Sequence, residues 1–373
     1  MKTAFNILLI GLLFVSCKQT QNETELAITA PSRSYTIERI VDNLGNPWGM
    51  TWLPDGSMLI TEKSGSLIHF KDGKKLEVSN IPDIYNRGQG GFLDVTLHPD
   101  YKNNGWIYFT HASQDGGGDG GNTKLIRAKL DGSALTDIES LYKAMPNTTK
   151  GQHFGSRIAF DNEGLVYFSV GDRGNRDVNP QDITRDNGKV YRLNADGSIP
   201  NDNPFVGKPN AKEAIYSYGH RNPQGMAKHP KTGDIWTHEH GPKGGDEVNI
   251  IKKGANYGWP VISYGVNYSG TKFTDKTKQA GMEQPIHYWV PSIAPCGMDF
   301  VTGGLYPDWE GHLLVGSLKF NYVELLKLDG NKVIGREKIA EDVGRVRNVK
   351  VGPNGYIYIA VEGQGIVRLV PKK

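Results

Sequence analysis

Short apolar runs separated by turn residues make up most of this chain. Met58-Leu59-Ile60, for example, follows the turn sequence Pro54-Asp55-Gly56, and an apolar run Leu-Val-Tyr-Phe follows Asn162-Glu163-Gly164. Runs of this length between Pro, Asp, Asn and Gly are typical of β-strands, and no long segment has the periodicity of a helix. The pattern therefore predicts an all-β protein.

One unit recurs along the chain: an apolar strand, a tight turn and a second apolar strand. Strand-turn-strand units repeated at intervals of about 45 to 75 residues are typical of β-propellers, and six copies predict six blades. A sandwich or barrel with chance similarity between its hairpins is the alternative. The copies span residues 49–61, 93–110, 156–169, 225–237, 297–316 and 346–360.

The N-terminus has the features of an export signal. Lys2 precedes a mostly apolar stretch over residues 5–15, which is too short to cross a membrane, and Phe14-Val15-Ser16-Cys17 resembles a lipobox. We expect lipidation at Cys17 and a place in the periplasm or cell envelope; an ordinary cleaved signal peptide is the alternative. The predicted parts are a signal peptide (1–17), a polar tether (18–35) and a propeller domain (36–373).

Composition narrows the possible functions. The 373 residues carry a formal net charge of +3 with 22% charged residues, a balance that does not suggest a nucleic-acid-binding protein. Gly is abundant, with 47 residues, as expected of a chain with many turns. Cys296 is the only cysteine besides Cys17, so no disulfide framework is expected.

Propeller topology places the polar residues of the repeats on one face. Residues just before the first strand of a blade and just after its second strand share one mouth of the central axis, because the two strands are antiparallel. The residues so placed are Gln89, His153, Arg221, Asn222, Trp289, Arg345 and Arg347 before first strands, and Asp172, Glu239 and Lys319 after second strands.

Four cations in this ring, Lys319, Arg221, Arg345 and Arg347, would repel one another unless they are neutralised, so they favour a ligand with several carboxylates or phosphates. Glu247, with backbone carbonyls nearby, offers a possible calcium site, although a single acid is more often a surface residue.

His153 and Asp172 suggest a general base with an orienting carboxylate, provided that both reach the mouth. Either residue alone is more often a structural turn residue. Trp289 offers an aromatic face for a sugar or a cofactor, and packing inside a blade is the equal alternative.

Several long motifs in the chain resemble the soluble aldose sugar dehydrogenases of the glucose/sorbosone dehydrogenase family, which use pyrroloquinoline quinone. The resemblance covers residues 36 to 371, and the family fold is a six-bladed propeller. The motifs are Gly-His-Arg-Asn-Pro-Gln-Gly (219–225), Asp-Glu-Val-Asn (246–249), Asn-Tyr-Gly-Trp-Pro (256–260) and Ser-Leu-Lys (317–319).

The resemblance implies a role for each matching residue. His153 would be the base, Asp172 its partner, and Arg221 with Asn222 would contact the quinone oxygens. Gly241 and Pro242 would offer carbonyls to a calcium ion at the cofactor, and Glu247 with Tyr257 resembles a second calcium site. The remaining cofactor contacts implied are Gln89, Tyr268, Lys319, Arg345 and Arg347.

The implied reaction is oxidation of an aldose at its anomeric carbon to a lactone, with hydride transfer to the quinone and reoxidation by an external acceptor, a quinone or a small redox protein. Two other functions are compatible with a propeller. One is a metal-dependent hydrolase such as a lactonase, which would need several carboxylates or histidines around one metal. The other is a non-catalytic propeller that binds sugar or protein at the cell surface.

Overall fold

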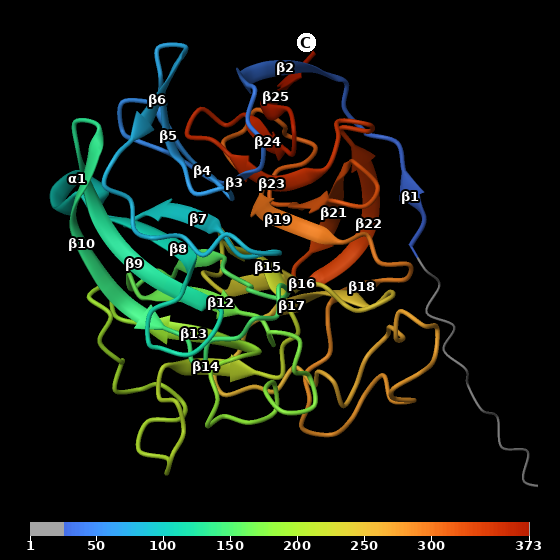
Figure 1. The fold of residues 1–373 in the computed structure, drawn as a ribbon. Coiled ribbons are helices and arrows are strands. Elements are labelled where there is room, and N and C mark those ends of the chain that lie inside the picture. The colour runs from blue at the N-terminus through green and yellow to red at the C-terminus, as the bar shows by residue number, and fades with distance from the viewer. Residues whose placement is uncertain (1–25, 373) are drawn as a thin grey trace, which may run out of the picture.

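Six β-sheets surround one axis in the computed structural model, which describes residues 26–372 (Figure 1). Within these residues the helical content is the single turn α1 (Tyr101–Asn104). In this part of the chain, no helix has the length and apolarity needed to span a membrane. The prediction of an all-β, six-bladed propeller is confirmed. The expected signal peptide, including Cys17, lies outside the described residues.

Blades 1 to 3 are four-stranded antiparallel sheets, and in each the first strand in sequence lies innermost. Blade 1 contains β3 (Pro47–Trp52), β4 (Met58–Glu62), β5 (Leu67–Lys71) and β6 (Lys74–Val78). Blade 2 contains β7 (Phe92–Leu97), β8 (Ile107–Ser113), β9 (Asn122–Asp131) and β10 (Ala134–Lys143). Blade 3 contains β11 (Ile158–Phe160), β12 (Val166–Val170), β13 (Lys189–Leu193) and β14 (Ile215–Tyr218).

Blades 4 to 6 follow the same order, and the last two also recruit strands from the N-terminal segment. Blade 4 contains β15 (Pro223–Lys228), β16 (Ile235–Glu239), β17 (Asp246–Ile250) and β18 (His287–Trp289). Blade 5 contains β19 (Pro295–Phe300), β20 (Leu313–Ser317), β21 (Val323–Asp329), β22 (Lys332–Ile339) and β1 (Ile28–Thr29). Blade 6 contains β23 (Val346–Val351), β24 (Ile357–Val361), β25 (Gly365–Pro371) and β2 (Tyr35–Asp42). Each predicted repeat is the inner pair of strands of one blade.

The ring closes through the N-terminal segment. Strand β2 pairs antiparallel with the C-terminal strand β25, so blade 6 is built from both ends of the domain (Figure 1). Strand β1 adds in parallel to β22, and Ser32 donates from its backbone N to Glu337 Oε2 at 2.9 Å. Within the segment expected to be a polar tether, 18–35, Ile28–Thr29 and Ser32 are thus bound to blade 5. A two-residue edge strand leaves no apolar signature in the sequence.

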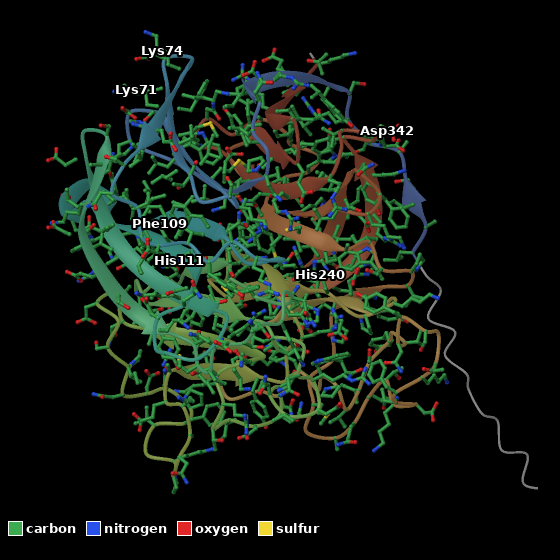
Figure 2. The ribbon with its side chains drawn as sticks, in the orientation of Figure 1. Lys71, Lys74, Phe109, His111, His240 and Asp342 are labelled. Carbon is green, nitrogen blue, oxygen red and sulfur yellow. The ribbon has the colours of Figure 1, made fainter. Side chains whose placement is uncertain are left out.

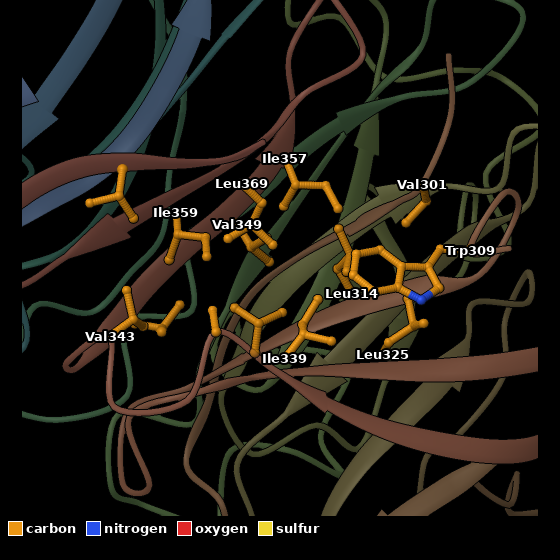
Figure 3. Close-up of a cluster of buried hydrophobic side chains, with 14 of the residues drawn as sticks. Val301, Trp309, Leu314, Leu325, Ile339, Val343, Val349, Ile357, Ile359 and Leu369 are labelled. Carbon is orange, nitrogen blue, oxygen red and sulfur yellow. The ribbon is translucent and has the colours of Figure 1, made fainter. Parts of the chain in front are cut away.

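Apolar clusters fill the spaces between neighbouring blades. In the cluster between blades 5 and 6, side chains such as Leu314 and Leu325 face Val349 and Ile359 (Figure 3). Burial of one such side chain stabilises a fold by about 1.5–3 kcal/mol. Comparable clusters lie between the other blades, so the strands form a rigid frame for the loops at their ends.

Arg157, which is 2% exposed, occupies the axis itself. Its guanidinium donates to Asp94 Oδ1 at 3.0 Å and lies over the Trp48 ring at 3.9 Å. Because Arg157 belongs to blade 3, this one side chain ties its own blade to all the others. Its partners are Trp48 of blade 1, Asp94 of blade 2, Gln224 of blade 4, Cys296 of blade 5 and Arg347 of blade 6.

Candidate active site

One mouth of the propeller gathers polar side chains from loops that precede first strands or follow second strands. His240, directly after β16, lies near the centre of the ring of blades (Figure 2). The loops before β7, β11 and β15 meet there through hydrogen bonds. His153 N donates to Gln89 Oε1 at 2.7 Å, and Gly155 N donates to Asn222 Oδ1 at 3.1 Å.

His153 and Asp172 form the central pair of this site. The imidazole Nδ1 lies 2.6 Å from Asp172 Oδ1, and the two side chains are 13% and 1% exposed. The backbone of His153 is left-handed, with φ of 59°, a conformation that non-glycine residues adopt only where the surrounding structure enforces it. The bond from His153 N to Gln89 holds this turn in place. The expected contact between His153 and Asp172 is present.

The protonation of the pair follows from its surroundings. Burial lowers the pKa of His153 below 6.5, and the nearby Arg221 guanidinium lowers it further, against the opposing effect of Asp172. Burial alone would raise the pKa of Asp172, but the hydrogen bond and charge of His153 and the charge of Arg221 bring it below 3.8. An ionised Asp172 accepts the Nδ1 proton, so neutral His153 carries its lone pair on Nε2.

Arg221 and Asn222 flank this pair at the start of β15. An Arg221 Nη donates to the His240 carbonyl at 3.0 Å, and the Arg221 carbonyl accepts from Asp172 N at 2.8 Å. Among the described residues Arg221 forms no ion pair within 4 Å, although its charge is felt by His153 and Asp172. Asn222 Nδ2 is buried and has no partner in this part of the chain. The Arg221 guanidinium and the Asn222 amide N–H are thus donors that suit ligand oxygens.

The predicted cation cluster is only partly neutralised, by one acid that the sequence interpretation did not include. Glu362 pairs with Arg345 Nε at 2.9 Å and also with Arg347. One carboxylate therefore serves two guanidiniums, and Lys319 forms no ion pair among residues 26–372. Even with Glu362 shared by two guanidiniums and Asp172 near Arg221, the four predicted cations leave an excess of positive charge. That charge suits a ligand with several carboxylates.

The turn that begins after β16 carries Gly241 and Pro242. Gly241 N donates to Asp246 Oδ1 at 2.8 Å, and a Cβ at Gly241 would lie 2.3 Å from carbonyl oxygens of the same turn. Asp246 also accepts from the neighbouring loop, for example from Ile293 N at 2.8 Å. The turn is thus rigid and follows His240, whose carbonyl already binds the guanidinium at the centre of the mouth. Carbonyl oxygens of such a turn suit a hard cation.

A second oxygen-rich group lies between β16 and β17. Glu239 and Glu247 are direct cross-strand partners, and Asn249 Nδ2 lies 3.4 Å and 3.2 Å from their carboxylates. Burial, with the charge of Glu239, raises the pKa of Glu247 to about 8, and Asn249 Oδ1 is buried without a partner among the described residues. The fold thus disfavours ionisation of both carboxylates together, and a cation would favour it. Two neighbouring acids with a free amide oxygen suit calcium.

The Tyr257 hydroxyl is already hydrogen-bonded to backbone groups. The hydroxyl donates to the Ile250 carbonyl at 2.6 Å and accepts from Lys252 N at 2.9 Å. Both bonds tie the hydroxyl to the backbone of residues 250–252, which leaves the Tyr257 carbonyl as the oxygen that we expect to reach a cation. Among the described residues no three His, Cys, Asp or Glu side chains converge as metal ligands, so a calcium ion here needs carbonyl and amide oxygens as well.

Two predicted contacts differ from the others: Trp289 is packed inside the fold, and Tyr268 is exposed on a loop. Trp289 belongs to β18, the outermost strand of blade 4, where it is 2% exposed and donates to Glu324 Oε1 at 3.1 Å. Its assignment to the mouth is corrected, because the intervening outer strand was not recognised in the sequence; the ring packs inside the fold. Tyr268 is 74% exposed, beside Asn267, which binds Arg176 of the loop after Asp172 at 2.8 Å.

Three residues of the site were missed from the sequence. Lys63 and Glu362 directly follow β4 and β24, so the topological rule that found Asp172 would have found them too. Trp259, whose indole N–H donates to Asp172 Oδ2 at 2.9 Å, lies in the long loop between β17 and β18, where no repeat locates it.

A six-bladed propeller with a carboxylate-oriented imidazole beside an excess of guanidinium and ammonium groups has a class of site that suits an anionic ligand next to an imidazole. The chain belongs to the glucose/sorbosone dehydrogenase family, whose characteristic domain matches residues 44–368. The resemblance found in the motifs is thereby confirmed.

Relatives cover nearly the whole chain. The aldose sugar dehydrogenase YliI of Escherichia coli is 40% identical over 344 residues, covering 90% of this chain and 92% of the relative. The structure of the soluble aldose sugar dehydrogenase of Escherichia coli in the apo form has a TM-score of 0.85 and 37% identity, covering 91% and 100% of the two chains. The aldose sugar dehydrogenase of Streptomyces coelicolor in its PQQ-bound form has a TM-score of 0.73 and 25% identity, covering 92% and 100%.

Proposed function

We propose that this protein oxidises aldose sugars at the anomeric carbon to lactones, with pyrroloquinoline quinone (PQQ) as its cofactor. The observation that carries the proposal is the buried His153–Asp172 pair at 2.6 Å beside a cation cluster with too few acids. Family membership and the PQQ-bound form of a relative support the same conclusion.

The residues of the site account for the proton in this reaction. The Nε2 lone pair of His153 accepts the proton of the anomeric hydroxyl, and ionised Asp172 stabilises the imidazolium that results. Arg221 places a positive charge beside the reacting centre, where negative charge develops on an oxygen atom. When bound, PQQ supplies the acceptor for the hydride that leaves the anomeric carbon, so the sugar loses two electrons and two hydrogens in all.

The cofactor would be held by charge and by amide groups. Arg221 and the unpartnered Asn222 amide suit the quinone oxygens, and the half-neutralised Arg345 and Arg347 with Lys319 suit carboxylates. Gln89 and Tyr268 complete the proposed contacts from the neighbouring loops.

Calcium is the proposed metal at two places. One is the rigid Gly241–Pro242 turn at the cofactor, and the other is the oxygen group around Glu247 and Tyr257. A divalent cation at the first place would add positive charge to that of Arg221, and at the second it would compensate the paired carboxylates.

The cellular setting is proposed from the sequence. A lipid on Cys17 would anchor the protein in the cell envelope after export, and the anchor would be its only link to a membrane. Turnover needs an external acceptor, a quinone or a small redox protein, to reoxidise the cofactor. No nucleic acid takes part.

The two other functions fit the geometry less well. A metal-dependent hydrolase needs several acids or histidines around one metal, whereas the mouth described here is rich in guanidinium groups. A binding propeller has no need for a buried, carboxylate-oriented imidazole.

The test is reconstitution. Purified apo-protein is loaded with PQQ and calcium, and reduction of a dye is followed with a panel of aldoses. We expect sugar-dependent dye reduction that requires the cofactor. Cofactor uptake without reduction for any aldose would reject the proposed reaction, and sugar or protein binding without cofactor uptake would favour the binding propeller.

A further inference from the structure

Trp259 touches the centre of the site from a loop with no part in the blade repeat. The backbone of this residue is fixed on both sides: its N donates to the Gly219 carbonyl at 2.9 Å, and its carbonyl accepts from Gln181 Nε2 at 2.8 Å. The side chain is 7% exposed. The indole therefore has a defined position that does not depend on a ligand.

The indole N–H completes the hydrogen bonding of Asp172. Asp172 Oδ1 accepts from His153 Nδ1 at 2.6 Å and from Gly174 N at 2.6 Å, and Oδ2 accepts from Trp259 Nε1 at 2.9 Å. A buried carboxylate with a donor on each oxygen cannot rotate without losing one of them. The orientation of the imidazole thus depends on the indole through the carboxylate.

The faces of the indole contact two further parts of the mouth. The Arg221 guanidinium lies 5.4 Å from the ring centroid, within the range of a cation–π contact. On another side, the Phe273 ring meets the indole edge-on at 5.2 Å, and Phe273 itself carries the Arg176 guanidinium at 4.5 Å. Phe273 lies later in the same connection between β17 and β18, so this part of the connection packs on the residue that holds Asp172.

We propose that Trp259 is a positioning residue: its indole N–H fixes Asp172 and so sets the orientation and proton affinity of His153, and Phe273 of the same connection packs against the indole. The charged and titratable groups that act on His153 are Asp172, Arg221 and Arg173, with His240 nearby. This inference rests on the proposed role of His153 as the base. The alternative is a tryptophan that only packs the loop.

A positioning role and a packing role for Trp259 differ in their effect on the proton affinity of His153, because packing alone does not set that affinity. Without the indole donor, the negative charge on Asp172 is less shared and binds the imidazolium more strongly. In Trp259→Phe we therefore expect the pKa of His153 to rise by about 0.5 to 1 unit. This value is measured in the apo-protein by NMR titration of the imidazole resonances, which requires neither cofactor nor sugar.

Trp309→Phe is the matched control. Trp309 is also buried and its indole N–H also donates to a carboxylate, Glu337 Oε2 at 3.0 Å, but it lies in the cluster between blades 5 and 6 (Figure 3). We expect it to leave the pKa of His153 unchanged. An unchanged pKa in Trp259→Phe, or an equal shift in both variants, would overturn the proposal.

A measurement on the unaltered protein guards against a variant that fails to fold. The indole N–H resonance of Trp259 is expected to move with the same midpoint as His153, because both groups share one carboxylate. An indole resonance that does not respond to pH through this range would contradict the proposal.

Kinetics then separate this inference from the proposed function. In the PQQ-loaded enzyme we expect kcat of Trp259→Phe to fall about tenfold at constant KM for the sugar. We also expect the acidic midpoint of the pH profile of kcat to move to higher pH. An unaltered enzyme with no sugar oxidation would reject the proposed function, and the NMR titration would still decide the role of Trp259.

Discussion

The two sides of the mouth are built in different ways. On the side of blades 2 to 4, His153 and Asp172 are 13% and 1% exposed, and each Asp172 oxygen has a donor from the protein. On the side of blades 5 and 6, the Arg345 side chain is 52% exposed, and Arg345 and Arg347 share the single carboxylate of Glu362. The His153–Asp172 pair is complete without a ligand, whereas the Arg345–Arg347 pair is not.

This difference suggests a division of labour. A fully hydrogen-bonded base keeps one geometry through a reaction, which lowers the barrier of the chemical step. Guanidiniums with too few acids bind an anionic ligand equally well in the ground state and in the transition state. Such binding raises the affinity for the ligand and contributes little to the rate. Changes on the first side should lower kcat, and changes on the second should weaken cofactor binding.

The largest effect is expected from removal of the base. His153→Gln keeps a polar side chain but cannot accept the proton, so kcat should fall by about 10² to 10⁴, the usual contribution of general base catalysis. Steady-state dye reduction at saturating PQQ and sugar measures this, and His69→Gln, a histidine on the outer strand β5, is the control. Full turnover in His153→Gln would show that the base is elsewhere.

The next effect concerns the opposite side. Arg347→Met removes a guanidinium that is 12% exposed, and loss of such a charge contact typically costs about 2 kcal/mol or more, or about thirtyfold in the dissociation constant for PQQ. Calorimetric titration measures it, and kcat at saturating cofactor should change much less.

Arg345→Met is the graded comparison for this prediction. Its guanidinium shares the same acid but is 52% exposed, so solvent screens it and only a few-fold loss of affinity is expected. If Arg345→Met and Arg347→Met lose equal affinity for PQQ, burial does not determine how much each guanidinium contributes to binding.

The pH dependence tests the base side without a mutation. Because burial and Arg221 hold the pKa of His153 below 6.5, the imidazole is neutral at pH 7 and the rate should be on a plateau there. As the pH falls through that pKa, His153 takes up a proton and kcat/KM should drop about tenfold per unit. If the acidic midpoint of the kcat/KM profile, which reports on the free enzyme, lies above pH 6.5, this assignment is contradicted.

The smallest effect is expected from calcium removal at the Glu247 group. Calcium should stabilise the fold by about 1.4 kcal/mol for each tenfold excess over its dissociation constant at that group, a rise of a few degrees in Tm. Chelation should reverse this rise in thermal unfolding experiments. In Glu247→Gln the rise should be reduced, whereas in Glu163→Gln, on an exposed turn of blade 3, it should remain. A calcium effect that is equal in Glu247→Gln and the parent would place the ion elsewhere.

The sequence predicts the frame of this molecule better than its loops. The inner hairpin of each blade repeats, so periodicity located all six and the rule of adjacent strand ends found His153, Asp172 and Arg221. Trp289 was misplaced because β18 intervenes before β19. Glu362 follows β24, so the same rule could have found it, but its ion pairs with Arg345 and Arg347 depend on tertiary contacts. Trp259 could not be found, because its hydrogen bond to Asp172 joins distant loops that no local pattern encodes.

The most direct test of the two-sided mouth compares the PQQ dissociation constants of His153→Gln and Arg347→Met by calorimetry. The division of labour predicts that His153→Gln binds the cofactor as the unaltered protein does, while Arg347→Met binds it about thirtyfold or more weakly. Equal weakening of both variants, or no uptake of the cofactor by the unaltered protein with calcium present, would contradict it.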